Sequence, residues 1–275
     1  MTRFGFVRRF IFIGAKGVLE QLRRAELEVL KGWLRPDMRI LEIGGGSGFQ
    51  ASVVASWGYE LMSIDLPERP FPPPYLFPVA NYDGVNIPAP DASFDLIFSS
   101  NVLEHVAHLP PLFAEMRRVL KHDGRAVHIL PTPTWRFWTC LTHYGDLSRA
   151  HLNLPRRQTA KAQEAQSPVA ESAAEATTTV ASNGRRSLAR RLRRAIFSEA
   201  HGEYPGALSE LYYFSRRRWL KVFRENGFDV QQVVGNELFY TGYALFPNIS
   251  IERRRELSRV LGSACLVYVM NKLDS

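Results

Sequence analysis

Short apolar runs alternate with helical patterns along the first half of the chain. Runs rich in Ile, Leu, Val and Phe, typical of buried strands, occupy residues 39–43, 59–65, 94–100 and 125–130. Apolar residues recur at helical spacing over 17–34, 49–57 and 111–121. We expect a turn at Asp123-Gly124 and no regular structure in the proline-rich run 71–78. This alternation is typical of an α/β domain with a parallel sheet.

The alternation stops after Pro131 and resumes near the C-terminus. The pattern there predicts a helix over 215–226 that ends before Gly227, because glycine often follows a helix C-terminus. One further helix and two strands are predicted over 250–261, 229–234 and 264–272. Between the two halves, residues 158–183 lack any aromatic residue, which predicts a disordered insert.

Composition excludes several classes of protein. The chain has 275 residues, of which 45% are hydrophobic and 23% charged, so wholesale disorder is excluded and a large core can form. The two cysteines, Cys140 and Cys265, give neither a disulfide framework nor a cysteine zinc site. We therefore expect a reducing cytosol and no metal site. The formal net charge of +8 favours anionic partners without identifying them.

The N-terminal segment combines cations with aromatic residues. Arg8, Arg9 and Lys16 lie close in sequence to Phe6 and Phe10. Two interpretations stay open, namely a basic tail before a helix packed on the domain, or an amphipathic segment at a membrane surface. No stretch of about 18 apolar residues suggests a transmembrane helix. We expect a cytoplasmic protein and leave open a peripheral contact with an anionic membrane.

The first strand ends in a glycine-rich loop. Gly44-Gly45-Gly46-Ser47-Gly48 lies between that strand and a helix, an arrangement that brings backbone N–H groups close to a ligand. Residues 46–51 also fit the dinucleotide fingerprint G-x-G-x-x-A, and Asp65 at the end of the next strand suits either ligand. Glu42, inside the first strand, favours a ligand with a positive centre and an ammonium group over a pyrophosphate.

Two further groups of polar residues lie near the ends of strands. Asp83-Gly84 precedes the strand at 94–100, and Asn101 to His105 follow it. In open α/β sheets, ligands bind at the carboxyl ends of the strands. Simpler roles stay open, with Asp83 as a turn residue, Asn101 as a helix cap, and Glu104 and His105 as a solvated helix start.

Four motifs combine along the chain, namely ILEIGGGSG, SIDLP, YDGVNIPAPDASFDLIFSSNVLEHV and FAEMRRVLKHDGRAVHILPTP. Together they resemble class I S-adenosylmethionine-dependent methyltransferases of the small-molecule group. The resemblance covers residues 35–135 and continues through 212–273. It implies a Rossmann-like seven-stranded sheet, mostly parallel with the last strand antiparallel. Helices on both faces, a lid insert after the fifth strand and S-adenosylmethionine as cofactor are implied as well.

The resemblance also divides the chain into four segments. They are a basic N-terminal helical segment (1–34), the cofactor-binding half of the domain (35–135), an acceptor lid insert with a disordered basic stretch (136–214, with 156–194 inside it), and the C-terminal completion of the sheet (215–275).

The resemblance assigns the glycine loop to the amino-acid end of the cofactor. Gly44, Gly46 and Gly48 would let the backbone approach that end, with Ser47 in the same loop. Glu42 would support the loop and the side that carries the ammonium group.

The remaining implied contacts follow the next strands. Asp65 would bind both ribose hydroxyls, and Leu66 would line the adenine pocket. Asp83, beside Gly84, would accept a hydrogen bond from the adenine amine. The residues implied at the methyl-donor end are Ser99, Ser100 and Asn101.

The acceptor and the catalytic base are less defined. We expect O-methylation of a small-molecule, glycan or lipid-linked acceptor, and the candidate bases are His105, His143 and His201. Two segments flanking the insert carry dense aromatic residues that suit an apolar or ring-bearing acceptor, or form a local core. These residues are Trp135, Phe137, Trp138, Tyr144, Tyr204, Tyr212, Tyr213 and Phe214.

Three other functions stay open. The glycine loop permits an NAD-dependent oxidoreductase, although Asp83 and the segment after residue 100 have no role there. The arginine-rich run at 185–194 permits RNA binding or RNA modification, but arginines without interleaved aromatics are more typical of a solvated segment, so we expect no nucleic-acid partner. The third alternative is a non-catalytic scaffold that binds the cofactor.

Overall fold

The computed structural model describes residues 17–71, 73–151, 207–241 and 248–273, with the backbone alone for 143–151 and 207–208. Its centre is a seven-stranded sheet in the order β3-β2-β1-β4-β5-β7-β6. The strands are β1 (Arg39–Ile43), β2 (Glu60–Asp65), β3 (Val79–Asn81), β4 (Phe94–Ser100), β5 (Leu120–Pro131), β6 (Phe228–Gly235) and β7 (Cys265–Lys272).

The pairing of the strands confirms the predicted fold class. β1, β2, β3, β4 and β5 form parallel pairs, whereas β7 runs antiparallel to both of its neighbours, β5 and β6. The carboxyl ends of β1, β2 and β4 therefore meet at one edge of the sheet. Ligands of open α/β sheets bind at such an edge.

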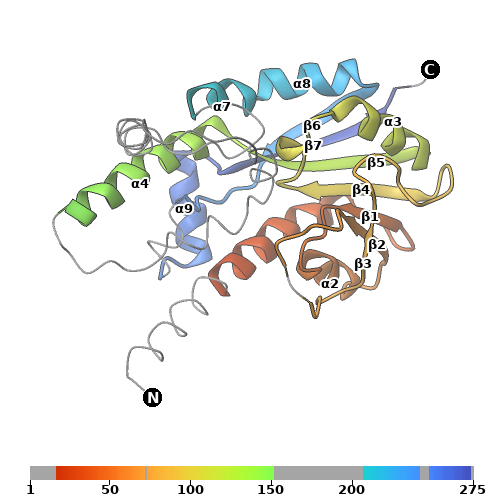
Figure 1. Ribbon diagram of the computed structural model, residues 1–275, viewed down its shortest axis with the longest axis horizontal. Coiled ribbons are helices and arrows are strands. Elements are labelled where there is room, and N and C mark those ends of the chain that lie inside the picture. Colours follow the sequence, from red (N-terminus) through yellow and green to blue (C-terminus); the bar gives the residue numbers. More distant parts are fainter. Residues whose placement is uncertain (1–16, 72, 152–206, 242–247, 274–275) are drawn as a thin grey trace, which may run out of the picture.

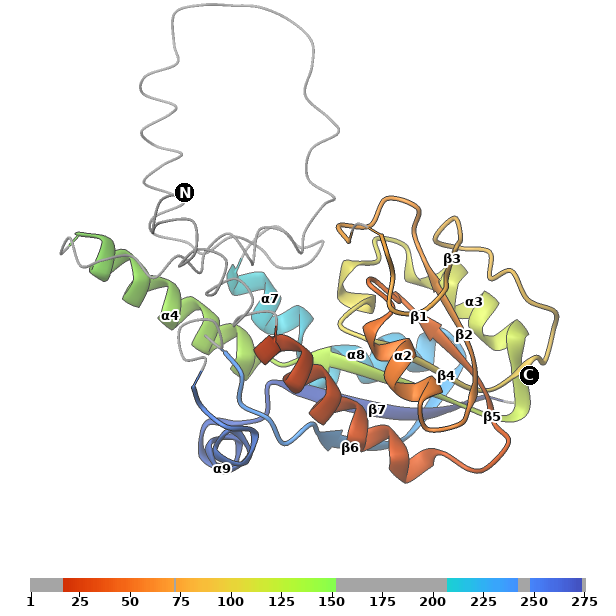
Figure 2. The same ribbon diagram turned by 90° about the horizontal axis from the view of Figure 1, so that it is seen from below.

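Helices cover both faces of the sheet (Figure 1). The α-helical residues 17–27 continue as the 3-10 helix η1 (Glu28–Trp33), and a second 3-10 helix, η2 (Leu103–His105), follows β4. The other described helices are α2 (Phe49–Ala55), α3 (Leu109–Val119), α4 (Pro133–His151), α7 (Ala207–Tyr213), α8 (Arg216–Glu225) and α9 (Ile251–Leu261). Figure 2 shows the N-terminal helix and α2 in front of the sheet, on the side away from α3 and α8.

Each face of the sheet has its own hydrophobic core. On one face, Phe113 of α3 packs with Phe223 of α8, and Trp219 is fully buried beside them. On the other face, Leu22 and Leu27 of the N-terminal helix are buried with apolar residues of α2. This two-sided burial explains why the central strands read as nearly continuous apolar runs.

The residues at its two ends explain where α8 begins and where it ends. The Ser215 side chain accepts a hydrogen bond from the backbone N–H of Arg218 and so caps the helix N-terminus. Gly227 follows the helix with φ of +81°, a left-handed conformation that glycine adopts without a steric cost. The helix predicted over 215–226 is therefore confirmed.

One short strand was missed, and two local predictions were wrong. The short strand β3 was not predicted, because three residues after a proline-rich run give too little pattern. The helix predicted to reach residue 34 is α-helical only to residue 27 and then narrows to a 3-10 helix. Asp123-Gly124 does not separate α3 from a later strand, because β5 already begins at Leu120 and the ladder to β4 shifts register there.

The insert after the fifth strand begins with α4 and ends with α7. The backbone N–H of Trp135 donates to the Thr132 side chain at 3.0 Å, which caps the start of α4 directly after β5. Arg136 of α4 and Glu210 of α7 form an ion pair of 2.6 Å, and both side chains are buried. α4 then extends away from the sheet (Figure 1). The basic stretch predicted at 156–194 lies outside the described residues.

Candidate active site

The loop between β1 and α2 depends on glycine for its shape. Gly44, Gly46 and Gly48 have φ angles of +83°, +53° and +75°, in the region that side chains disfavour. The N–H groups of Gly44 and Gly45 donate to the carbonyl of Ile64 in β2, at 2.8 and 3.1 Å. The loop is therefore held against β2 at the carboxyl edge of the sheet.

Glu42 lies directly beneath this loop. Its side chain is buried, and its carboxyl accepts a hydrogen bond of 2.6 Å from the Ser63 hydroxyl. Burial raises the pKa of Glu42 to about 7, against the opposing effect of the Ser63 hydrogen bond. A Cβ on Gly45 would overlap the Ser63 hydroxyl and lie 3.2 Å from the Glu42 carboxyl. Glu42 and Ser63 thus support the loop from below, and Gly45 leaves room for them.

Phe71 and residues 73–78 lie against the glycine loop. A Cβ on Gly46 would lie 3.1 Å from the ring of Phe71. The backbone N–H of Leu76 donates to the carbonyl of Ser47 at 2.9 Å. Phe71 and Leu76 therefore hold this part of the chain next to the glycine loop.

Asp65, the last residue of β2, faces the same loop. One of its carboxylate oxygens accepts from the N–H of Gly46 and the other from the N–H of Leu66, each at 2.7 Å. Leu66 is 42% exposed, and a Cβ on Gly84 would lie 3.2 Å from its side chain. The structure thus brings Asp65, Leu66 and Gly84 together, and their assignment to the nucleoside end of the cofactor stays a prediction.

Asp83 closes a turn after β3. Its exposed carboxylate accepts from the N–H groups of Val85 and Asn86, at 2.9 and 2.7 Å, and from the Asn86 amide at 2.6 Å. The Asn86 side chain and these two N–H groups lower the pKa of Asp83. Asp83 is therefore an ionised turn residue, in line with the simpler interpretation of the sequence, and it adjoins Gly84.

The two serines that end β4 point to opposite faces of the sheet. The Ser99 hydroxyl forms a 2.8 Å hydrogen bond with Nδ1 of His128, and both side chains are fully buried. Burial lowers the pKa of His128 to about 3, so this ring is neutral. The Ser99 hydroxyl therefore serves the core, whereas the Ser100 hydroxyl faces the N-terminal helix.

Asn101 has an unusual backbone directly after β4. Its φ is +55°, its N–H donates to the carbonyl of Ile129 at 2.8 Å, and its amide donates to the Ser100 hydroxyl at 3.1 Å. It does not cap η2, because the residue before that helix is Val102 and no side chain caps it. Val102 covers Gly44, where an added Cβ would overlap its side chain. The segment after β4 therefore lies on the glycine loop.

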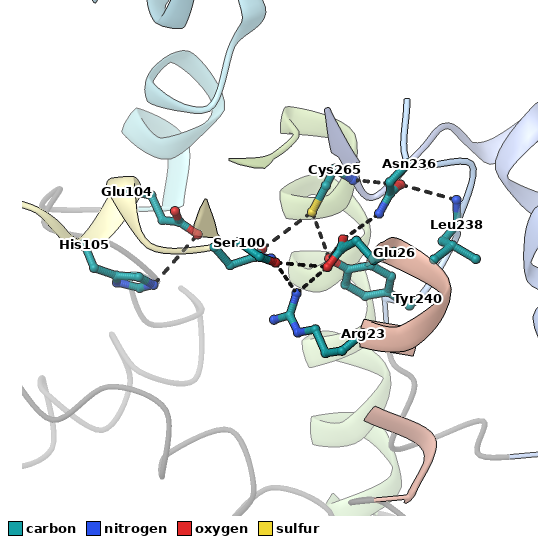
Figure 3. Close-up of polar contacts among 10 residues, drawn as sticks. Arg23, Glu26, Ser100, Glu104, His105, Asn236, Leu238, Tyr240 and Cys265 are labelled. Atoms are coloured by element: carbon teal, nitrogen blue, oxygen red, sulfur yellow. Dashed lines mark hydrogen bonds and ion pairs between the residues drawn. The ribbon is translucent and has the colours of Figure 1, made fainter. Parts of the chain in front are cut away.

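Glu104 is a buried carboxyl at this edge (Figure 3). Its side chain has no exposed surface, and neither oxygen has a hydrogen-bond partner within the described residues. Burial raises the pKa of Glu104 to about 8 and lowers that of His105 to about 4. The ring of His105 lies 3.9 Å from the Glu104 carboxyl and is about one third exposed. A solvated helix start is therefore the wrong interpretation of Glu104.

The side chains of the other two candidate bases lie outside the described residues. His143 lies on α4 with its side chain outside the described residues, and His201 lies wholly outside them. Within the described ranges, no three His, Cys, Asp or Glu residues gather as metal ligands. No helix in those ranges is long and apolar enough to span a bilayer.

A polar cluster beside Ser100 joins segments that are distant in sequence (Figure 3). Glu26 is buried and pairs with Arg23 at 2.7 Å. It also accepts hydrogen bonds from the Ser100 hydroxyl at 3.2 Å and from the Asn236 amide at 2.8 Å. These contacts could not be predicted from the sequence, because no local pattern joins residue 26 to residues 100 and 236.

Two buried weak acids complete this cluster. The Tyr240 hydroxyl and the Cys265 thiol lie 2.8 Å apart, and the thiol lies 3.5 Å from the Asn101 amide oxygen. Burial raises the pKa of both groups well above their usual values. Both are therefore neutral at physiological pH and act as hydrogen-bonding groups next to the end of β4.

Comparison with known proteins concerns the family and the fold of this chain. A family described as a methyltransferase domain matches residues 16–233. A solved chain from the Haloferax volcanii complex between the Trm112 methyltransferase activator and a methyltransferase is 14% identical, with a TM-score of 0.50, over 95% of this chain and 93% of that one. An S-adenosylmethionine-dependent methyltransferase from Mesorhizobium loti is 18% identical, with a TM-score of 0.48, over 90% and 98%. At these identities, the likeness to solved structures concerns the fold alone.

Curated relatives match a shorter region. The biotin biosynthesis bifunctional protein BioHC of Cellvibrio japonicus is 37% identical over 94 residues, which are 32% of this chain and 18% of that protein. The ubiquinone/menaquinone biosynthesis C-methyltransferase UbiE of Cupriavidus metallidurans is 31% identical over 114 residues, which are 38% and 47%. The chain therefore spans less than half the length of these two relatives.

Proposed function

Because the chain belongs to the methyltransferase domain family and is a class I S-adenosylmethionine-dependent methyltransferase, we propose that it methylates an oxygen of a small-molecule acceptor. The reaction site is the edge formed by the carboxyl ends of β1, β2 and β4. One observation carries this proposal, namely that the glycine loop, Asp65 and the buried carboxyl of Glu104 gather at that edge.

The residues present fit the cofactor. When bound, S-adenosylmethionine would supply a methyl group that bonds to an electron-rich acceptor atom as the bond from that methyl group to the sulfonium sulfur breaks, and the sulfur would leave as a neutral thioether. Loop glycines without Cβ atoms let the backbone approach its amino-acid end, over Glu42. Asp65 would orient the ribose hydroxyls, and Leu66 with Gly84 would line the adenine pocket. Asp83, ionised in its turn, would accept a hydrogen bond from the adenine amine.

Glu104 is proposed as the group that takes the acceptor's proton. A hydroxyl becomes a better nucleophile when a positioned base removes its proton during transfer, and a base works best when its pKa is near the working pH. The raised pKa of Glu104, about 8 through burial, meets that condition. His105, with a pKa lowered to about 4, is a neutral neighbour and a weaker base. His143 and His201 remain predictions of the sequence.

The insert after β5 is proposed as the acceptor lid. α4 and α7 are held together by the buried Arg136–Glu210 pair and by contact between Trp135 and Phe214. They expose large apolar side chains, which suit an apolar or ring-bearing acceptor such as a lipid-linked or glycan intermediate. These side chains are Phe137, Leu141 and Tyr212.

Carbon methylation is a second candidate. The relative from Cupriavidus metallidurans is described as a C-methyltransferase, and the same carboxyl could remove a proton from an activated carbon. A cytoplasmic location, with peripheral contact to an anionic membrane through the basic N-terminal segment, also remains a proposal from the sequence.

The test is a transfer assay with S-adenosylmethionine carrying a labelled methyl group. Phenolic, carboxylic and hydroxylated acceptors, with and without a lipid tail, are incubated with the wild type and with Glu104→Gln. We expect a labelled product whose methyl resonance is that of a methoxy group, and at least a tenfold lower rate for Glu104→Gln. A methyl resonance typical of a methyl group on carbon would contradict oxygen methylation and favour the second candidate, carbon methylation. No transfer to any acceptor class, with cofactor bound, would count against an enzymatic role.

A further inference from the structure

The N-terminal helix brings a cation to the end of β4. Nη1 of Arg23 lies 2.7 Å from the Glu26 carboxylate and 3.4 Å from the Ser100 hydroxyl (Figure 3). The side chain is 22% exposed. Within the described part of the chain, Nε and Nη2 of Arg23 make no hydrogen bond. Arg23 therefore has unused N–H donors beside the edge where the cofactor and acceptor meet.

The position of Arg23 is set by a fixed anion. Glu26 is 1% exposed, and it is also bound by the Asn236 amide at 2.8 Å and the Tyr240 hydroxyl at 3.4 Å. Burial opposes the charge on Arg23, but the adjacent Glu26 carboxylate, with smaller contributions from Tyr240 and Cys265, raises the pKa of the guanidinium. Arg23 thus stays charged and is oriented before any ligand arrives.

The unused donors of Arg23 lie in the region of the proposed base. The guanidinium interacts electrostatically with the buried Glu104 carboxyl, and Ser100, which Arg23 contacts, lies four residues before it in sequence. A planar guanidinium with free N–H groups pairs with a carboxylate or phosphate through two parallel hydrogen bonds. A neutral ligand would leave much of that capacity unused.

We propose that Arg23 is an oxyanion-binding residue of the methyl-transfer site. Its ligand is a carboxylate or a similar oxyanion, supplied either by the amino-acid end of the cofactor or by an acid group of the acceptor. The inference rests on the proposed function, because it places this anion at the methyl-donor end. Glu26 acts through Arg23 and is a positioning residue.

Calorimetric titrations of the full chain separate the two sources of the anion. S-adenosylhomocysteine carries the amino-acid carboxylate, whereas 5′-methylthioadenosine lacks it. If the cofactor supplies the anion, Arg23→Gln weakens S-adenosylhomocysteine binding at least tenfold and leaves 5′-methylthioadenosine binding unchanged. If the acceptor supplies it, S-adenosylhomocysteine binding is unchanged, but benzoate and phenyl phosphate lose at least tenfold in affinity for the S-adenosylhomocysteine complex. Neutral benzamide is the matched probe, and its binding does not depend on Arg23.

Arg24→Gln is the matched control, because it makes the same substitution and removes the same charge at the next position of the same helix. Arg24 is the next residue, is exposed, and its guanidinium lies 5.8 Å from the centre of the Phe49 ring. We expect its affinities for all five probes to stay within twofold of the wild type. Equal losses in the Arg23 and Arg24 variants would show a general effect of charge and overturn the inference.

A second variant separates a loss of stability from a loss of anion binding. Arg23→Gln alone leaves the buried Glu26 carboxylate without its cation, which destabilises a folded protein. The double variant Arg23→Gln with Glu26→Gln removes both charges and should melt closer to the wild type. In titrations of this double variant, the affinity for the anionic ligands must fall selectively, as it does for Arg23→Gln. Unchanged binding of every anion in this variant would overturn the inference while the proposed function stands, whereas no S-adenosylhomocysteine binding by the wild type would overturn both.

Discussion

The carboxylate of Asp65, at the end of β2, accepts a hydrogen bond of 2.7 Å from the backbone N–H of Gly46. This bond joins Asp65, the last residue of β2, to the glycine loop that follows the neighbouring strand β1. Both groups are thereby fixed relative to each other before a ligand binds, so little ordering is left for the binding step. This arrangement is the structural basis of the proposed cofactor site.

Gly45→Ala should damage the loop. The new Cβ would overlap the Ser63 hydroxyl, which also donates to Glu42. We expect a loss of about 1–3 kcal/mol in the free energy of unfolding, as for overpacking elsewhere, and at least tenfold weaker S-adenosylmethionine binding. Gly32→Ala is the matched control, because nothing lies within 4 Å of a Cβ there. Urea denaturation measures the free energy of unfolding, and calorimetry measures the affinity for S-adenosylmethionine. If both values were the same in the two variants, the proposed role of the glycine loop in cofactor binding would be contradicted.

The rate of methyl transfer should rise with pH through the ionisation of Glu104. Its pKa is raised by burial to about 8, and a base accepts a proton only in its ionised form. The bound sulfonium favours that form, so the inflection in kcat should lie at about pH 8 or below. Glu104→Gln should remove the inflection. A wild-type profile without this inflection, or one that the variant retains, would exclude Glu104 as the base.

Glu104 should also make stability depend on pH. Its pKa is raised by burial from 4.5 to about 8, so the folded protein binds this proton more tightly than the unfolded chain does. The stabilisation is fully present below about pH 4.5 and is lost as the pH rises through about 8. We therefore expect Glu104→Gln to stabilise the protein, relative to wild type, by roughly 4 kcal/mol more at pH 9 than at pH 5. Glu256→Gln, at an exposed site on α9, should show no such difference in urea denaturation.

The buried ion pair between α4 and α7 should be sensitive to the loss of one partner. Arg136 and Glu210 lie 2.6 Å apart with side-chain exposures of 2% and 0%. Arg136→Met leaves a buried carboxylate without its cation, which costs about 3–5 kcal/mol in comparable sites. The double variant with Glu210→Gln should recover most of that loss. A single-variant cost below about 1 kcal/mol in urea denaturation would show that the pair does not hold these helices together.

The sequence predicted most of the sheet because its signals are local. The apolar run at 39–43 became β1 with the same bounds, and 94–100 became β4. The glycine loop and Asp65 were likewise found from short motifs with fixed spacing. In contrast, β3 has only three residues, too few for a period of two to be recognised.

The rest of the site depends on burial and on long-range contacts. The sequence could not tell that Glu104 is fully buried, because a polar residue after a strand is usually solvated. Glu26 meets Ser100 and Asn236 only after the N-terminal helix packs on the sheet. Ser99 was expected at the methyl-donor end, yet the alternation of side chains along β4 turns its hydroxyl toward His128.

The measurement that tests the central claim most directly is a calorimetric titration with S-adenosylmethionine. It compares the wild type, Asp65→Ala, and Asp123→Asn as a control at an exposed acid far from the loop in sequence, with NADH as the competing ligand. The account predicts that the wild type and the control bind S-adenosylmethionine alike, that Asp65→Ala binds it at least tenfold more weakly, and that none binds NADH. Binding of NADH alone, or equal binding of S-adenosylmethionine by Asp65→Ala and the wild type, would contradict it.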